Sequence, residues 1–146
     1  ITKRIGEYMD TETTKLPIEE NLTAEALRDP EKLAQFIVAV LDSKRAKGIK
    51  LLHVEKQTVI ADYFVVCTGN SRTQIRALAD EVEFKLSQYG ISPSHTEGAD
   101  SGVWVLQDFD SVIVHIFTPD GRDFYKLEKL YQDTTEKDIT ELITED

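Results

Sequence analysis

The sequence predicts an α/β (α+β) protein in which helices flank a single mixed β-sheet. Apolar residues recur at helical spacing in three segments, which begin near residues 30, 71 and 119. Short apolar runs of strand length lie between these segments. The resulting order is helix, strand, strand, helix, an optional short strand, two strands and a helix, which is typical of helices packed on one sheet. A length of 146 residues suits a single domain with its own core.

The first helix has a start signal and an apolar face. Asp29 supplies an N-cap carboxylate, and Pro30 occupies the first helical position. Gly48 fits the position just past the helix end. The apolar residues fall at the spacing of one helical face: Leu33, Phe36, Ile37, Val40 and Leu41.

Two strands and a second helix follow. Residues 49–54 and 63–68 are apolar runs that predict strands, and the second run reads as a buried strand. Ser71 with Gln74 three residues later matches a capping box, so a helix is expected from there to Gly90.

The C-terminal half predicts a hairpin and a last helix. A short edge strand is expected at 95–97, and stronger strands at 103–106 and 112–117. The link 107–111 is short, so the two stronger strands should pair antiparallel. Residues 118–120 then open a last helix.

The charge concentrates at the two ends of the chain. The formal net charge is -10, with four basic and seven acidic residues in 1–30 and one basic and six acidic residues in 132–146. We therefore predict an acidic, loosely docked N-terminal extension at 1–30, a domain at 31–131 and an acidic C-terminal tail at 132–146. The tail is either solvated or a short helix that uses Ile139, Leu142 and Ile143.

Composition disfavours several classes of protein. No apolar run approaches the ~20 residues of a membrane span. Cys67 is the only cysteine, which excludes an internal disulfide and a multi-cysteine zinc site, and its apolar neighbours indicate a buried thiol. The acidic balance disfavours generic nucleic-acid binding through a basic face. His53, His95 and His115 lack metal-binding spacing, and His115 is expected to be a structural histidine of its strand.

One pattern admits enzymatic chemistry. Gly69-Asn70-Ser71 precedes a helix, and Asp108 and Asp110 could share a Mg²⁺ ion, as in a nucleotidyltransferase. The simpler interpretation is that both carboxylates are turn residues of the hairpin that bond locally.

Two aromatic residues suggest a contact surface instead. Trp104 has apolar neighbours on both faces of its strand, so one face either packs in the core or needs a partner. Phe109 lies at the tip of a short acidic connection, where we expect it to be exposed. A self-associating scaffold that buries the Trp104 face stays open as a third class.

Several separate stretches resemble one known family, the ribosomal silencing factors, also called Iojap-like proteins. The resemblance covers roughly residues 31–131 in the right order. The matching stretches are 61–71, 75–80, 97–98, 104–109, 112–117 and 122–130.

The resemblance implies a cytoplasmic, non-enzymatic protein that needs no cofactor or metal. Family members bind the large ribosomal subunit through its fourteenth protein, on the face that meets the small subunit. They thereby block subunit joining and repress translation under nutrient limitation, and organelle relatives assist large-subunit assembly. The implied fold is related to nucleotidyltransferases without their active site. The implied partner-binding residues are Trp104 and Phe109, with Asp108 and Tyr125 nearby, and a homodimer stays open.

This chain departs from the family at three places. Asp110 stands where glycine is common, so the hairpin turn loses the easy access to positive φ that glycine gives. Gly121 replaces a helix-favouring residue at a cost of about 1 kcal/mol in helix propensity. Tyr131 replaces a tryptophan.

Overall fold

The computed structural model describes residues 15–55, 58, 60–98, 102–130 and 134–144. Within these ranges one mixed sheet has the strand order β3-β4-β5-β2-β1-β6. β2 and β5 pair in parallel at the centre, and all other neighbours pair antiparallel. The strands are β1 Lys47–His53, β2 Tyr63–Thr68, β3 His95–Glu97, β4 Trp104–Asp108, β5 Val112–Phe117 and β6 Thr135–Lys137. The predicted mixed sheet with flanking helices is confirmed.

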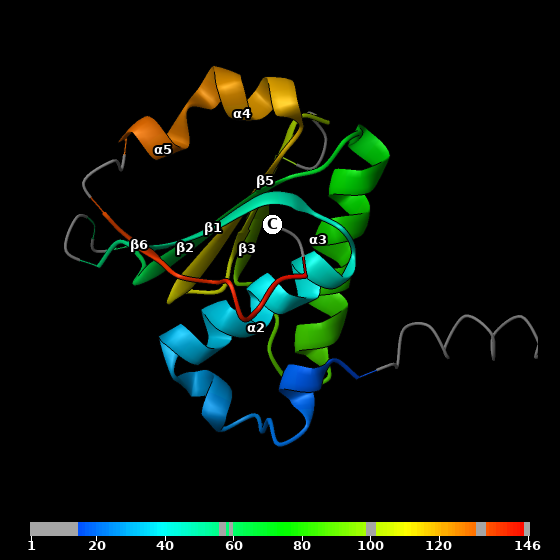
Figure 1. Cartoon of the computed structure of the whole chain (residues 1–146), viewed down its shortest axis with the longest axis vertical. Coiled ribbons are helices and arrows are strands. Elements are labelled where there is room, and N and C mark those ends of the chain that lie inside the picture. The colour runs from blue at the N-terminus through cyan, green and yellow to red at the C-terminus, as the bar shows by residue number, and fades with distance from the viewer. Residues whose placement is uncertain (1–14, 56–57, 59, 99–101, 131–133, 145–146) are drawn as a thin grey trace, which may run out of the picture.

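Helices cover both faces of the sheet (Figure 1). α2 and α3 pack on one face, and α4 lies across the other, followed by α5. Apolar side chains form a core cluster on each face, and the larger cluster lies beneath α2 and α3. The helices are α2 Pro30–Ser43, α3 Arg72–Ser87, α4 Pro119–Tyr125 and α5 Leu127–Leu130, with 3₁₀ turns η1 Pro17–Glu19 and η2 Ala26–Arg28.

α2 begins where its signals predicted and ends earlier than expected. The Asp29 carboxylate accepts the N–H of Lys32 at 3.1 Å, which caps the helix. The helix stops at Ser43, and Arg45, two residues later, takes a left-handed φ of 67°. Gly48 instead lies in β1 at an irregularity of the β1–β2 register, with φ 56°. The predicted role of Gly48 as a helix terminator is therefore wrong.

α3 and the β4–β5 hairpin agree with their local signals. Ser71 Oγ accepts the N–H of Gln74 at 3.1 Å and caps α3. The Gln74 amide oxygen accepts the N–H of Asn70, one residue before the N-cap. β4 and β5 pair antiparallel as predicted, but β4 continues to Asp108, so the link between them is shorter than the expected 107–111. β3 adds the predicted edge strand.

The last helix is divided, and Gly121 has a packing reason. Thr118 caps α4, and Lys126 with φ 50° separates α4 from α5. A Cβ on Gly121 would stand 2.4 Å from the carbonyl oxygen of Val103. Glycine at this position therefore lets the first turn of α4 approach the segment that leads into β4, which offsets its poor helix propensity.

The described part of the N-terminal segment packs more tightly than expected. Leu27 is 2% exposed and joins the core beneath α2 and α3. The Glu19 carboxylate is buried and pairs with Lys85 of α3. The Glu19 contacts reach residues more than 60 positions away, whereas η2, which carries Leu27, packs on the neighbouring α2. Charge patterning along the chain carries no signal for either contact. The predicted boundary at residue 30 stays a prediction, and residues 1–14 lie outside the described part.

The C-terminal segment forms a strand where a short helix or a solvated tail was expected. β6 pairs with β1, with Leu52 opposite Glu136. Ile139 then enters the core, and the N–H of Thr144 bonds to the Asp42 carboxylate at 3.1 Å. The edge of β1 offers backbone partners to this segment, and that pairing outweighs the weak helical periodicity.

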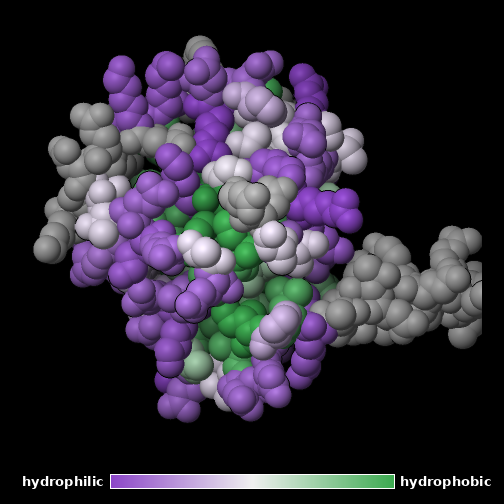
Figure 2. All heavy atoms as spheres, viewed as in Figure 1, coloured by the Kyte–Doolittle hydropathy of each residue, from purple (hydrophilic) through white to green (hydrophobic). Residues whose placement is uncertain are grey.

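On the side shown in Figure 2, hydrophobic atoms are framed by hydrophilic ones.

Candidate functional site

Trp104 opens β4 on the sheet face that carries α4 and α5. Along β4 the side chains of Trp104, Leu106 and Asp108 are half-buried, whereas Val105 and Gln107 are buried on the α3 side. Trp104 and Leu106 pack at the margin of the smaller core cluster. Part of the indole therefore supports the fold and part stays accessible to a partner.

Gly98 makes room for the indole ring. Its φ is 84°, and a Cβ there would lie 2.6 Å from a ring carbon of Trp104 and 2.4 Å from the Trp104 carbonyl oxygen. Only glycine tolerates both this backbone conformation and this close approach. Gly98 thus positions Trp104, a role that sequence spacing alone does not reveal.

Phe109 does not form part of the same surface, and its expected exposure is wrong. Its side chain is 5% exposed and lies in the core cluster beneath α2 and α3, on the face opposite Trp104. The N–H of Phe109 donates to the Val112 carbonyl at 2.9 Å, which closes the hairpin. Leu27 and Tyr89 line the same depression as the ring. The docked N-terminal segment is the reason that this loop aromatic is buried.

Asp108 and Asp110 are used within the hairpin turn. An Asp108 carboxylate oxygen accepts the N–H of Asp110 at 2.7 Å. Asp110 itself takes φ 71°, the left-handed conformation that aspartate tolerates better than most residues. Ser94 donates its hydroxyl to the Asp110 carboxylate at 3.2 Å and its N–H to the Asp108 carbonyl. These bonds confirm that both carboxylates bond locally, although Asp108 is the last residue of β4 and only Asp110 lies in the turn itself.

The proposed partner-binding residues are therefore divided by the fold. Trp104 and Asp108 share one face of β4, with Leu106 between them. Beside them runs edge strand β3, whose residues His95–Glu97 are all exposed. Tyr125 ends α4, and its side chain lies outside the described residues. We call Trp104, Leu106, Asp108 and β3 the β3–β4 surface.

Other reactive side chains are shielded. Burial raises the pKa of the Cys67 thiol to about 12, so the thiol stays protonated and unreactive at neutral pH. Burial likewise lowers the pKa of His115 to about 4, so its imidazole is neutral, and it packs against Phe64 with ring centroids 4.9 Å apart. The buried interpretation of both residues is confirmed. Among the described residues, no group of three or more His, Cys, Asp or Glu could hold a metal ion.

The wider sequence and fold decide the family. The sequence model described as "Ribosomal silencing factor during starvation" matches residues 27–146. The chain belongs to the ribosomal silencing factor family.

Along the described residues, no helix combines the length and the apolar character that crossing a membrane requires.

Two named relatives and a solved structure give the extent of the similarity. The chain is 38% identical over 109 residues to ribosomal silencing factor RsfS of Bacillus subtilis, which covers 75% of this chain and 92% of that protein. It is 28% identical over 102 residues to "Mitochondrial assembly of ribosomal large subunit protein 1" of Mus musculus, over 66% of this chain and 43% of that protein. A crystal structure of a Chromobacterium violaceum protein superposes with a TM-score of 0.69 at 34% identity, over 71% of this chain and 87% of that one.

The family match extends past the stretches from which sequence reasoning started. It includes β6, which the structure adds to the sheet, and Leu27, which the structure places in the core. A signal that could have found Leu27 is its apolar side chain two residues before the Asp29 cap, since an apolar residue just ahead of a helix start often packs onto that helix.

Proposed function

We propose that the protein binds the large ribosomal subunit through its fourteenth protein and blocks joining of the small subunit, which represses translation under nutrient limitation. The membership in the ribosomal silencing factor family carries this proposal. The mouse relative, named for assembly of the ribosomal large subunit, supports that subunit as the partner. We place this action in the cytoplasm.

The β3–β4 surface is the proposed contact. Its half-buried Trp104 and Leu106 offer apolar area that the packing of α4 leaves partly accessible. Asp108 adds an acidic group at the far end of the same strand face. Tryptophan anchors at the centre of an interface typically contribute ~2 kcal/mol or more. Tyr125 is proposed as a further contact, and Phe109 is proposed to act through the fold by supporting the hairpin.

The proposed mechanism is steric and requires no catalysis. The two hairpin carboxylates bond within their own turn, the Cys67 thiol is buried, and the His115 imidazole is neutral and enclosed. None of these groups is arranged to attack a substrate or to transfer a proton to one. A domain docked on the joining face of one subunit excludes the other subunit by overlap alone.

Charge supports the same partner. The chain carries a net charge of -10, whereas ribosomal proteins are typically basic. Complementary charge raises the rate of association and orients the encounter, and apolar anchors then supply much of the affinity.

Cosedimentation with purified large subunits tests the proposal. The protein should pellet with large subunits, and added protein should lower the light-scattering signal of subunit joining in proportion to the amount bound. Small subunits alone serve as the control and should not retain it. A protein that stays in the supernatant with intact large subunits would overturn the proposal. Light scattering of the protein alone at several concentrations separates a self-associating scaffold from a monomer that binds.

A further inference from the structure

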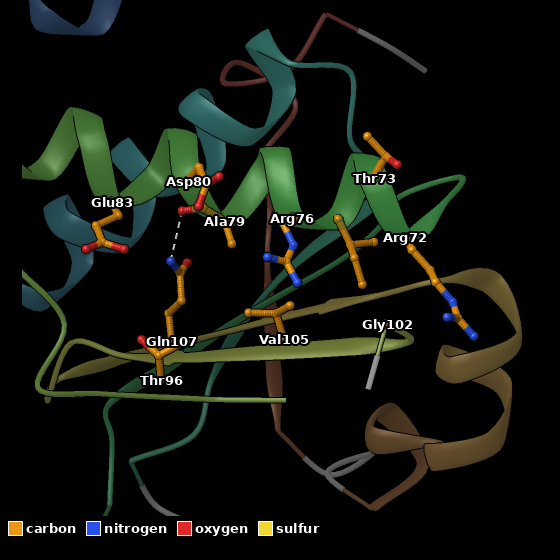
Figure 3. Close-up of a pocket in the computed structure, with 11 residues that line it drawn as sticks. Arg72, Thr73, Arg76, Ala79, Asp80, Glu83, Thr96, Gly102, Val105 and Gln107 are labelled. Atoms are coloured by element: carbon orange, nitrogen blue, oxygen red, sulfur yellow. Dashed lines mark hydrogen bonds between the residues drawn. The ribbon is translucent and has the colours of Figure 1, made fainter. Parts of the chain in front are cut away.

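A groove lies between α3 and the β3–β4 hairpin, on the sheet face opposite Trp104 (Figure 3). Its volume is about 340 Å³, which lies at the lower end of the roughly 300–1,000 Å³ typical of small-molecule sites. Ile75, Ala79 and Val105 give it apolar walls. Of the β3–β4 surface, only Thr96 also lines this groove.

Gln107 presents a buried acceptor in this groove. Its side chain is 1% exposed and rises from β4 toward α3. The amide nitrogen donates to the Ala79 carbonyl at 2.9 Å, which fixes the orientation of the amide. The amide oxygen has no hydrogen-bond partner among the described residues. A buried acceptor destabilises the fold unless a donor reaches it, so a ligand with an N–H group would find a matching site.

The two ends of the groove differ in charge. Asp80 and Glu83 lie on α3 at the end where Gln107 stands, and they add carboxylate acceptors there. Arg72 lies at the opposite end, and Arg76 extends from α3 into the space between helix and strand. A Cβ on Gly102 would lie 2.7 Å from the Arg72 side chain, so glycine leaves room for Arg72 along the groove wall. Guanidinium groups are the side chains that bind phosphate with paired hydrogen bonds.

We propose that this groove binds a nucleoside monophosphate, with the phosphate at Arg72 and Arg76 and an amino-bearing base at Gln107. Guanine carries two adjacent N–H donor groups, and these match the Gln107 oxygen together with the carboxylate of Asp80 or Glu83. The apolar walls between the two ends suit the sugar and the ring. Guanosine monophosphate is therefore the probe of choice.

Titration of the isolated, ¹⁵N-labelled protein tests the proposal. Guanosine monophosphate should shift the backbone amides of residues 72–83 and 105–107 and the side-chain amide of Gln107. It should bind at least tenfold more tightly than guanosine, inorganic phosphate or xanthosine monophosphate, which lacks the amino group. Arg72→Ala, at an exposed position, should weaken binding at least tenfold without changing the melting temperature. Lys32→Ala, an exposed change on α2, should leave binding unchanged.

Three results would overturn the proposal. The first is the absence of shifts in these segments at millimolar nucleotide. The second is equal binding of nucleotide and inorganic phosphate, which would reduce the site to a simple anion contact. The third is equal binding by the wild type and Arg72→Ala. Because no ribosomal particle is present in the titration, its failure is distinguishable from failure of the proposed ribosomal function.

Discussion

The ammonium group of Lys85 lies 2.9 Å from the Glu19 carboxylate, and both side chains are almost completely buried, at 3% and 1% exposure. Tyr89 donates its hydroxyl to the same carboxylate at 2.8 Å, and the N–H of Leu16 donates to it as well. Burial alone would raise the pKa of Glu19, but the bonds from Leu16, Lys85 and Tyr89 outweigh burial and lower it. The N-terminal segment is thereby attached to α3.

Lys85→Met should destabilise the protein by about 3–5 kcal/mol, because it leaves the Glu19 carboxylate buried without its cation. Urea denaturation followed by circular dichroism measures this change. The double variant Glu19→Gln/Lys85→Met should recover a large part of the loss, since it removes both charges. Equal destabilisation in the single and the double variant would mean that packing, and not the uncompensated charge, is the cause.

Trp104→Ala should weaken binding to the large subunit at least tenfold, because it removes the apolar anchor of the β3–β4 surface. Titration calorimetry with the fourteenth large-subunit protein measures the affinity. Circular dichroism should show a folded protein at the assay temperature, although some stability is lost because the ring also packs on the core margin. Affinity equal to the wild type would remove Trp104 from the proposed contact.

Phe109→Ala should lower the stability of the fold and should change the affinity for the large subunit little. The ring is 5% exposed, and truncation of a buried phenylalanine typically costs about 3–5 kcal/mol. Thermal melting of the variant measures this loss. Residual folded protein at low temperature should still bind the large subunit with near wild-type affinity. A stable variant with weakened binding would instead indicate that Phe109 reaches the partner.

His115→Leu should remove part of the acid sensitivity of the fold. Burial lowers the pKa of His115 from 6.5 to about 4, so the unfolded chain binds the proton more readily than the folded one. The contribution of His115 to the free energy of unfolding should therefore be fully present above pH 6.5. It should be lost as the pH drops toward 4, by about 3 kcal/mol. Urea unfolding at several pH values should give a flatter curve for the variant. If the stability of the wild type and of the variant depended on pH in the same way, His115 would not be a source of the acid sensitivity.

Association with the large subunit should slow as salt rises. Increasing the ionic strength from about 0.1 M to 1 M shortens the screening length from about 10 Å to 3 Å, which weakens attraction between the acidic protein and a basic partner. Stopped-flow fluorescence with labelled protein measures the association rate. A rate that does not depend on salt would show that charge does not guide the encounter.

Local signals in the sequence were sufficient for most helices and strands. The Asp29 cap with Pro30 and the Ser71 cap each marked a helix start, because a cap bonds to backbone groups within three residues. Strands β2 and β5 were predicted at their observed bounds, since both are continuous apolar runs. The resemblance of the chain to one family could also be recognised from the sequence, because the matching residues lie in contiguous stretches.

The tertiary structure decided the features that depend on contacts between distant segments. The burial of Phe109 follows from packing alongside Leu27, and the β6 strand follows from the open edge of β1. Gly121 is explained only by its approach to Val103. Periodicity and capping describe a segment's own backbone, whereas burial and strand pairing are set by which other segment the folded chain brings to it. For that reason the sequence indicated Trp104 as a contact, and only the fold separated it from Phe109.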